Sequence, residues 1–141
     1  KRGSQWRFPI DHELQMDSDF HFVPMNDVLF DLQRKIILEA ADKGDCVIVG
    51  RCANHILQDK CLSVFIHAPY EYRVQTIMER TGREEKSAQK LVKKVDKERR
   101  TYYEYFTDRK WADLSQYHLA FDSSKFDQDT IVKMIKLGLG V

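Results

Sequence analysis

The chain has 141 residues, with 23 Lys and Arg against 22 Asp and Glu and a formal net charge of +1. This length corresponds to one ordinary domain, and a composition of 43% hydrophobic and 32% charged residues excludes an intrinsically disordered chain. The balanced charge argues against a protein that wraps a nucleic acid polymer or adheres to an anionic membrane. No apolar run approaches the roughly 20 residues of a bilayer span, so we expect a single-domain cytoplasmic protein.

The cysteines and histidines form no metal-binding pattern. Cys46, Cys52 and Cys61 contain no C-x-x-C pair, and the five histidines form no H-E-x-x-H motif. We therefore predict no metal ligands among them and expect the thiols to be reduced.

The first half of the chain predicts one long helix and two strands. Residues 1–25 have no sustained hydrophobic period and are predicted to be irregular, whereas the apolar stripe that follows Asn26 predicts a helix that ends at Gly44. Residues 46–49 (CVIV) form a short β-branched run, which is typical of a strand buried on both faces. Residues 62–66 (LSVFI) repeat this pattern, and the twelve residues between the two runs are enough for a helical crossover.

The second half predicts three helices and one more strand. A helix should start after Pro69 and end at Gly82, and a second, highly charged helix should cover about 84–106, with Tyr102 and Phe106 in its core-facing stripe. Residues 118–121 (HLAF) predict a third strand, and Asp127 can cap a last helix. Strands that alternate with helices predict a mainly parallel sheet in a three-layer α/β domain.

Polar residues follow each predicted strand, where ligands bind in open parallel sheets. Arg51 follows the first run, His67 follows the second, and residues 122–124 follow the third. The guanidinium of Arg51 suits a bidentate contact with a phosphate or carboxylate, although a structural ion pair with a helix carboxylate explains it equally well. Ser123 and Ser124 have no neighbouring His and Asp, which argues against a serine hydrolase.

A second candidate site is the charged segment 93–104. Asp96 can reach Arg99 and Arg100 at helical spacings of three and four, so part of this cluster is self-compensated. A solvated helix face is the alternative interpretation. Arg80 belongs to a basic turn that also fits a helix end.

The runs CVIVGRCANHIL, LSVFIHAPYEYRVQTIMER, KKVDKERRTYYEYF and YHLAFDSSKF resemble the cytidylate kinase-like family, relatives of bacterial CMP kinase within the P-loop nucleoside monophosphate kinases. The resemblance covers about residues 26–135. It implies that Arg51 binds the acceptor monophosphate and that Arg99 is the first arginine of a lid that clamps phosphates during transfer. The resulting site assignment is Arg99 and Arg100 as catalytic residues and Arg51, Asp96, Arg80 and Ser124 as substrate-binding residues.

The chain departs from the family pattern at several positions. Cys52 stands where CMP kinases have Asp, while Tyr103 and Phe106 stand where their lid has Asp and Arg. The sequence has no G-x-x-x-x-G-K-[ST] motif, which in these kinases supplies backbone amides, a lysine and a Mg²⁺ ligand to the donor. We therefore expect a strand and a P-loop upstream of Lys1, with the strand lying between the CVIV and LSVFI strands.

The resemblance implies ATP-dependent phosphoryl transfer to a nucleoside monophosphate such as CMP, with ATP and Mg²⁺ held through the upstream loop. A non-catalytic nucleotide-binding or protein-interaction relative and a kinase for another small anionic metabolite are the alternatives. The expected partner is a small nucleotide, with neither a nucleic acid polymer nor a membrane. Within one domain, residues 1–25 form an irregular acceptor-side segment, 26–80 and 112–141 the core, and 81–111 the lid.

Overall fold

The computed structural model describes residues 27–141, so the predicted irregular segment 1–25 lies outside the described residues. The helices and strands, in chain order, are α2 (Asp27–Lys43), α3 (Ala53–Ile56), β1 (Val64–His67), α4 (Tyr70–Thr81), α5 (Glu85–Thr107), β2 (Leu119–Asp122) and α6 (Gln128–Leu139). Two 3₁₀ turns, Gln58–Lys60 and Leu114–Gln116, precede β1 and β2. The architecture is mixed α/β, as the alternation in the sequence predicts.

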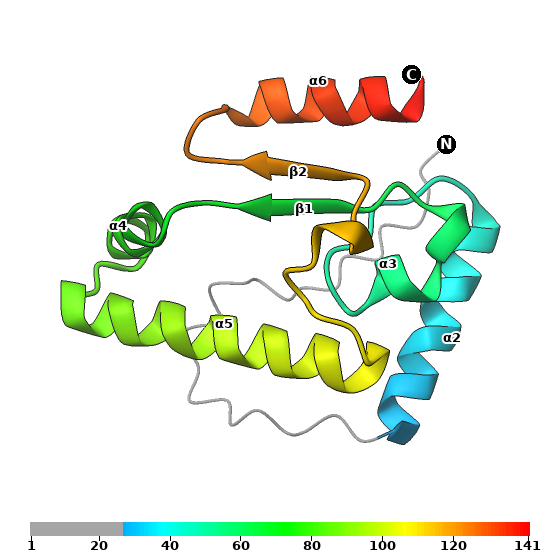
Figure 1. The fold of residues 1–141 in the computed structure, drawn as a ribbon, viewed down its shortest axis with the longest axis horizontal. Helices are drawn as coiled ribbons and strands as arrows, with labels where there is room; N and C mark the ends of the chain where they lie inside the picture. Colours follow the sequence, from blue (N-terminus) through cyan, green and yellow to red (C-terminus); the bar gives the residue numbers. More distant parts are fainter. Residues whose placement is uncertain (1–26) are drawn as a thin grey trace.

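The two strands form a small parallel sheet. Val64 lies opposite Leu119 at one end of the pair and His67 lies opposite Asp122 at the other. Parallel pairing requires a crossover, and the chain makes it through α4 and α5. Both strands therefore end on the same side of the molecule, next to α4, as Figure 1 shows. Their carboxyl ends can present side chains to one site.

The prediction of a buried strand at residues 46–49 is wrong for the described structure. This run forms no strand, and the side chains of Val47 and Val49 are 93% and 76% exposed. A β-branched run becomes a strand only when another strand satisfies its backbone hydrogen bonds, and no described strand pairs with it. The strands predicted at 62–66 and 118–121 do form, each displaced toward its carboxyl end.

The helix boundaries follow the stop and cap signals in the sequence. Gly82 adopts a left-handed conformation (φ 70°) at the end of α4 and donates its N–H to the Met78 carbonyl oxygen. At the start of α6, the Asp127 carboxylate accepts the Thr130 N–H at 2.8 Å, which confirms the predicted cap. The helix predicted over 84–106 is one continuous helix, α5, so most of the predicted lid is helical, and its motion stays a prediction.

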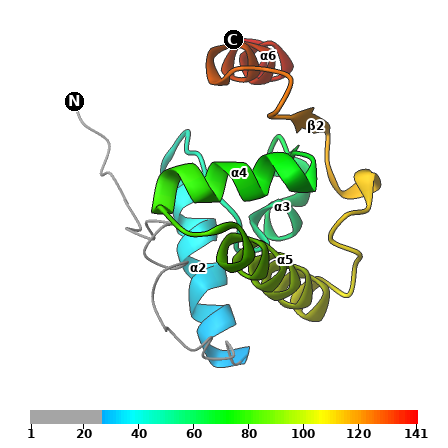
Figure 2. The ribbon, with the colours of Figure 1, turned by 90° about the vertical axis from the view of Figure 1, so that its left-hand side faces the viewer.

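Two apolar clusters hold the helices together. Ile37 of α2 packs with Ala53 and Leu57, and Val74 of α4 packs with Ala88 and Val92 of α5. Figures 1 and 2 show α5 and α6 on opposite sides of the strand pair. No described helix is both long and apolar enough to cross a membrane.

The burial of the aromatic residues of α5 differs from the prediction. Tyr103 is the buried aromatic of this helix, at 5% exposure, whereas Tyr102 and Phe106 are only half-buried. Phe106 stacks on Phe30 of α2 with ring centroids 4.1 Å apart. These rings join α5 to α2 and leave Tyr105, at 68% exposure, facing solvent.

Candidate functional site

A cavity of about 480 Å³ opens at the carboxyl ends of β1 and β2, and we call it the strand-end pocket. Its volume is within the range of small-molecule sites. Polar side chains from β1, α4, α5 and the segment after β2 line it, among them His67, Arg73, Arg80, Thr81, Asp96, Arg99 and Ser123. Aliphatic and aromatic side chains such as Ile66, Val95 and Phe126 complete the wall. The pocket thus combines an apolar surface with a few convergent charges.

Arg73 and Asp96 form an ion pair inside this pocket. The Arg73 Nη1 lies 2.7 Å from the Asp96 Oδ1, and the two side chains are 34% and 22% exposed. Arg73 is on α4 and Asp96 on α5, so the pair joins the two helices that flank the pocket. A guanidinium held on one side in this way keeps its remaining N–H donors in a defined direction.

Arg99 lies one turn further along α5 and lines the same pocket. Burial lowers the pKa of its guanidinium, with the charge of Asp96 opposing this shift and that of Arg73 adding to it. A partly desolvated cation beside another cation favours an anionic ligand, because the ligand's charge offsets both burial and repulsion. Arg80 is exposed at the pocket rim, and within residues 27–141 it has no ion-pair partner.

Of the predicted site residues, Arg80, Asp96 and Arg99 come together in this pocket, but three others do not line it. Arg100 is exposed elsewhere on α5. Ser124 points back to the chain, because its hydroxyl donates to the Asp122 carboxylate at 2.6 Å. Its neighbour Ser123 lines the pocket instead.

Arg51 is the third residue outside the pocket. Its guanidinium lies 5.9 Å from the ring centroid of Tyr102, within cation–π range. Tyr102 follows Arg99 by three residues on α5, so the ring that Arg51 contacts lies about one helical turn from Arg99. Arg51 itself has a left-handed backbone (φ 59°) between Gly50 and Cys52, which are also left-handed. Such a run of positive φ values is costly outside glycine.

The three departures from the family pattern have structural roles. Cys52 is 3% exposed, and burial raises the pKa of its thiol to about 12, so it stays neutral. The Tyr103 hydroxyl accepts a hydrogen bond from Asn54 Nδ2 at 3.0 Å. Phe106 belongs to the stack on Phe30. These residues pack α5 against α2 and α3 instead of offering charges to a nucleotide.

Arg73 was not among the site residues predicted from the sequence. Its signal was present, because it lies in the first turns of the helix that directly follows β1, four residues after Pro69. The first turns of a helix after a parallel strand lie at the ligand-binding edge of the sheet.

The described residues do not form a fitting site for Mg²⁺. They contain no group of three His, Cys, Asp or Glu side chains that could hold a metal ion. The two pocket carboxylates are already engaged, Asp96 with Arg73 and Asp127 with the first turn of α6.

Comparison with known proteins gives the same relationship. A sequence model described as the cytidylate kinase-like family matches residues 10–125. Proteins named cytidylate kinase from Methanococcoides burtonii and Methanopyrus kandleri are 33% and 24% identical over 80% and 72% of this chain. The chain spans 63% and 58% of their lengths.

A solved structure, that of an uncharacterized protein from Eubacterium ventriosum, superimposes with a TM-score of 0.72 at 36% sequence identity. The superposition covers 81% of this chain and 65% of that one. Together with the match over most of the sequence, this similarity shows that the chain belongs to the cytidylate kinase-like family.

Proposed function

We propose that the protein transfers a phosphoryl group from ATP to a nucleoside monophosphate such as CMP. The observation that carries the proposal is the convergence of Arg73, Arg80 and Arg99 on the strand-end pocket of a cytidylate kinase-like chain. Three guanidinium groups against the carboxylates of Asp96 and Asp127 leave the pocket with an excess of positive charge. Such a pocket favours a ligand with several negative charges.

Phosphoryl transfer needs positioning and charge neutralisation more than covalent chemistry from the protein. In this proposal, Arg99 neutralises charge on the transferring group and Arg73, oriented by Asp96, fixes a phosphate oxygen. The apolar side chains of Ile66, Val95 and Phe126 pack against the ligand in this proposal. Arg80 is free to close on the ligand because no described residue pairs with it.

The acceptor monophosphate is proposed to lie between Arg51 and Arg99. Arg51 lies over the ring of Tyr102, and Tyr102 is three residues from Arg99 on α5. These positions support the assignment. The P-loop, which binds ATP and Mg²⁺, is proposed to lie in a segment N-terminal to Lys1. The three-layer arrangement with an added first strand beside β1 belongs to the same proposal.

A kinase for another small anionic metabolite is the second candidate. Cys52, Tyr103 and Phe106 supply no charge where CMP kinases have Asp, Asp and Arg, and this favours an acceptor that needs fewer polar base contacts.

The test is phosphoryl transfer by the complete gene product that contains these 141 residues, with ADP release measured for CMP, UMP, AMP and non-nucleotide phosphates. Arg99→Ala should lower kcat by about a hundredfold or more, because it removes charge stabilisation in the transition state. Lys97→Ala is the matched control, since Lys97 is an exposed cation of α5 that does not line the pocket. Equal loss in both variants, or no transfer to any acceptor, would refute the proposal.

A further inference from the structure

A second cavity, of about 490 Å³, lies at the opposite ends of the strands. Its lining comes from the end of α5, the segment that follows it, the 3₁₀ turn before β2, and α3. Gln116 of this lining also accepts, through its carbonyl oxygen, a hydrogen bond from Ser63 just before β1. The cavity is therefore next to the amino ends of β1 and β2, away from the strand-end pocket. We call it the Arg109 pocket.

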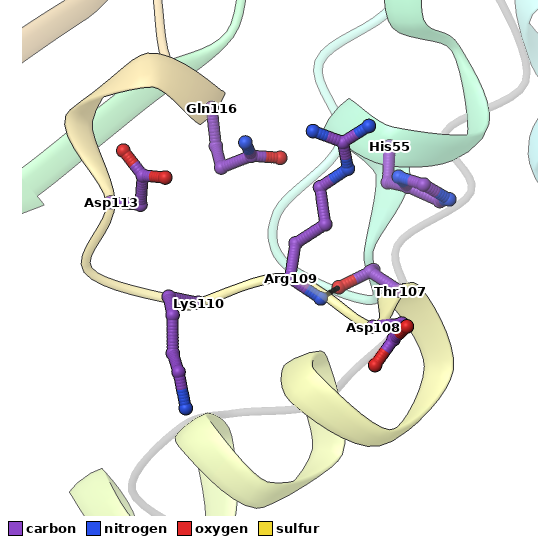
Figure 3. A pocket seen from close by; sticks show the side chains of 7 residues that line it. All are labelled: His55, Thr107, Asp108, Arg109, Lys110, Asp113 and Gln116. Atoms are coloured by element: carbon purple, nitrogen blue, oxygen red, sulfur yellow. Dashed lines mark hydrogen bonds between the residues drawn. The ribbon is translucent and has the colours of Figure 1, made fainter.

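Figure 3 shows the arrangement of charges in this cavity. The Arg109 guanidinium extends into the space between the Gln116 amide and the His55 imidazole, whereas the Lys110 ammonium points away from them. Lys110 is paired with Glu104 at 3.1 Å outside this group. Within the described residues, the Arg109 guanidinium has no hydrogen-bond or ion-pair partner.

The carboxylates of the cavity do not neutralise Arg109 directly. The Asp113 carboxylate accepts the Ser115 N–H at 2.9 Å, and this bond does most to lower its pKa, with Arg109 a smaller cause. The Asp108 carboxylate points away from Gln116 and from the tip of Arg109 (Figure 3).

A second arginine adds to the positive potential at His55. Burial lowers the pKa of this imidazole first, and the charges of Arg109 and of Arg34 on α2 lower it further. Both guanidinium groups therefore act on one half-buried ring from different elements. The Gln116 amide nitrogen donates to the Ser115 hydroxyl at 3.4 Å, and its oxygen is turned toward Arg109 (Figure 3). An oxyanion in this space would therefore meet the guanidinium fork of Arg109 and the protonated His55 imidazole.

We propose that the Arg109 pocket binds a tetrahedral dianionic oxyanion, a phosphate group either free or as a monoester, at a site separate from the strand-end pocket. Arg109 is the main ligand, and His55 becomes protonated more readily when the anion is present. Binding is consequently stronger at lower pH. The charges that act on His55 are those of Arg109 and Arg34, and Lys110, Asp108 and Asp113 are the other charged groups that line the cavity.

The experiment is an NMR titration of the His55 imidazole in the protein with all 141 residues. Sulfate serves as the pH-titration probe, because it stays dianionic over the range, with chloride at equal ionic strength as the reference. Sulfate should raise the pKa of His55, and inorganic phosphate and methyl phosphate at constant pH should shift the same signals. A response to inorganic phosphate alone would identify a free-anion site, and a response to both a phosphate-group site.

Arg109→Gln should weaken the sulfate effect on His55 at least about fivefold, because the charge-assisted contact of an exposed arginine is lost. Arg100→Gln removes the same charge from an exposed position that lies outside the cavity and should leave the effect intact. A His55 pKa that does not respond to sulfate would overturn the proposal. So would an equal response in the Arg109→Gln variant, which would mean general ionic screening.

Discussion

The Arg73–Asp96 ion pair should stabilise the protein measurably, because it joins α4 to α5 beside the candidate site. Two unit charges about 4 Å apart attract by about 4 kcal/mol at the effective dielectric of a protein surface, but desolvation and side-chain ordering offset most of this. With side chains 34% and 22% exposed and an N···O distance of 2.7 Å, we expect a coupling free energy of about 1 kcal/mol. Loss of this coupling corresponds to a fall in Tm of about 3 °C for a domain of this size.

A double-mutant cycle isolates this coupling. Arg73→Gln, Asp96→Asn and the double variant are compared with the wild-type protein by urea unfolding at neutral pH. The double variant should be less destabilised than the sum of the single variants by about 1 kcal/mol. A coupling below about 0.3 kcal/mol, which is within the error of additivity, would show that the pair does not hold the two helices together.

Further predictions concern Arg51, the cysteines, the α6 cap and the lid. Arg51→Ala should weaken CMP binding tenfold or more, roughly, and Arg51→Lys should rescue only part of it, whereas a lower Tm with unchanged CMP binding would assign Arg51 to packing on Tyr102. Cys46 is exposed and should react with a thiol reagent in the native protein, while buried Cys52 should react only on unfolding. Burial raises the pKa of Cys52 from 9.0 to about 12, so its thiol favours folding below pH 9.0, and this contribution should be lost between pH 9.0 and about 12 and be absent from Cys52→Ala. The Thr130 contacts lower the pKa of Asp127, so Asp127→Ala should reduce Tm at neutral pH, and the difference should vanish as acid protonates the wild-type carboxylate. Hydrogen exchange in residues 81–111 should slow when ATP and acceptor are added, and equal exchange in both states would argue against a lid.

The helices could be predicted because their signals are local. The apolar face after Asp27 defines α2, and Gly82 and Asp127 mark helix boundaries through their own backbone or side-chain hydrogen bonds. The conformation of residues 46–49 could not be predicted in the same way, since a strand depends on a partner that is often distant in the sequence. Hydrophobicity shows that such a run can pair but not that its partner is present.

The candidate site could be predicted only in part for the same reason. Asp96 and Arg99 share one helix face, so their helical spacing places them together. Arg73 meets Asp96 across 23 residues, which only the packing of α4 on α5 reveals. Ser123 lines the pocket in place of the predicted Ser124. The reason is that the N–H and the hydroxyl of Ser124 both donate to the Asp122 carboxylate, which turns Ser124 back to the chain.

Binding of CMP to the strand-end pocket tests the central claim most directly. In a titration of the ¹⁵N-labelled complete gene product with CMP, the side-chain Nε–H signals of Arg73 and Arg99 should shift together and saturate with one affinity. Arg99→Ala should weaken that affinity, and Lys97→Ala should not. Saturable CMP binding that leaves the Arg73 and Arg99 signals unchanged would place the nucleotide elsewhere and contradict the account.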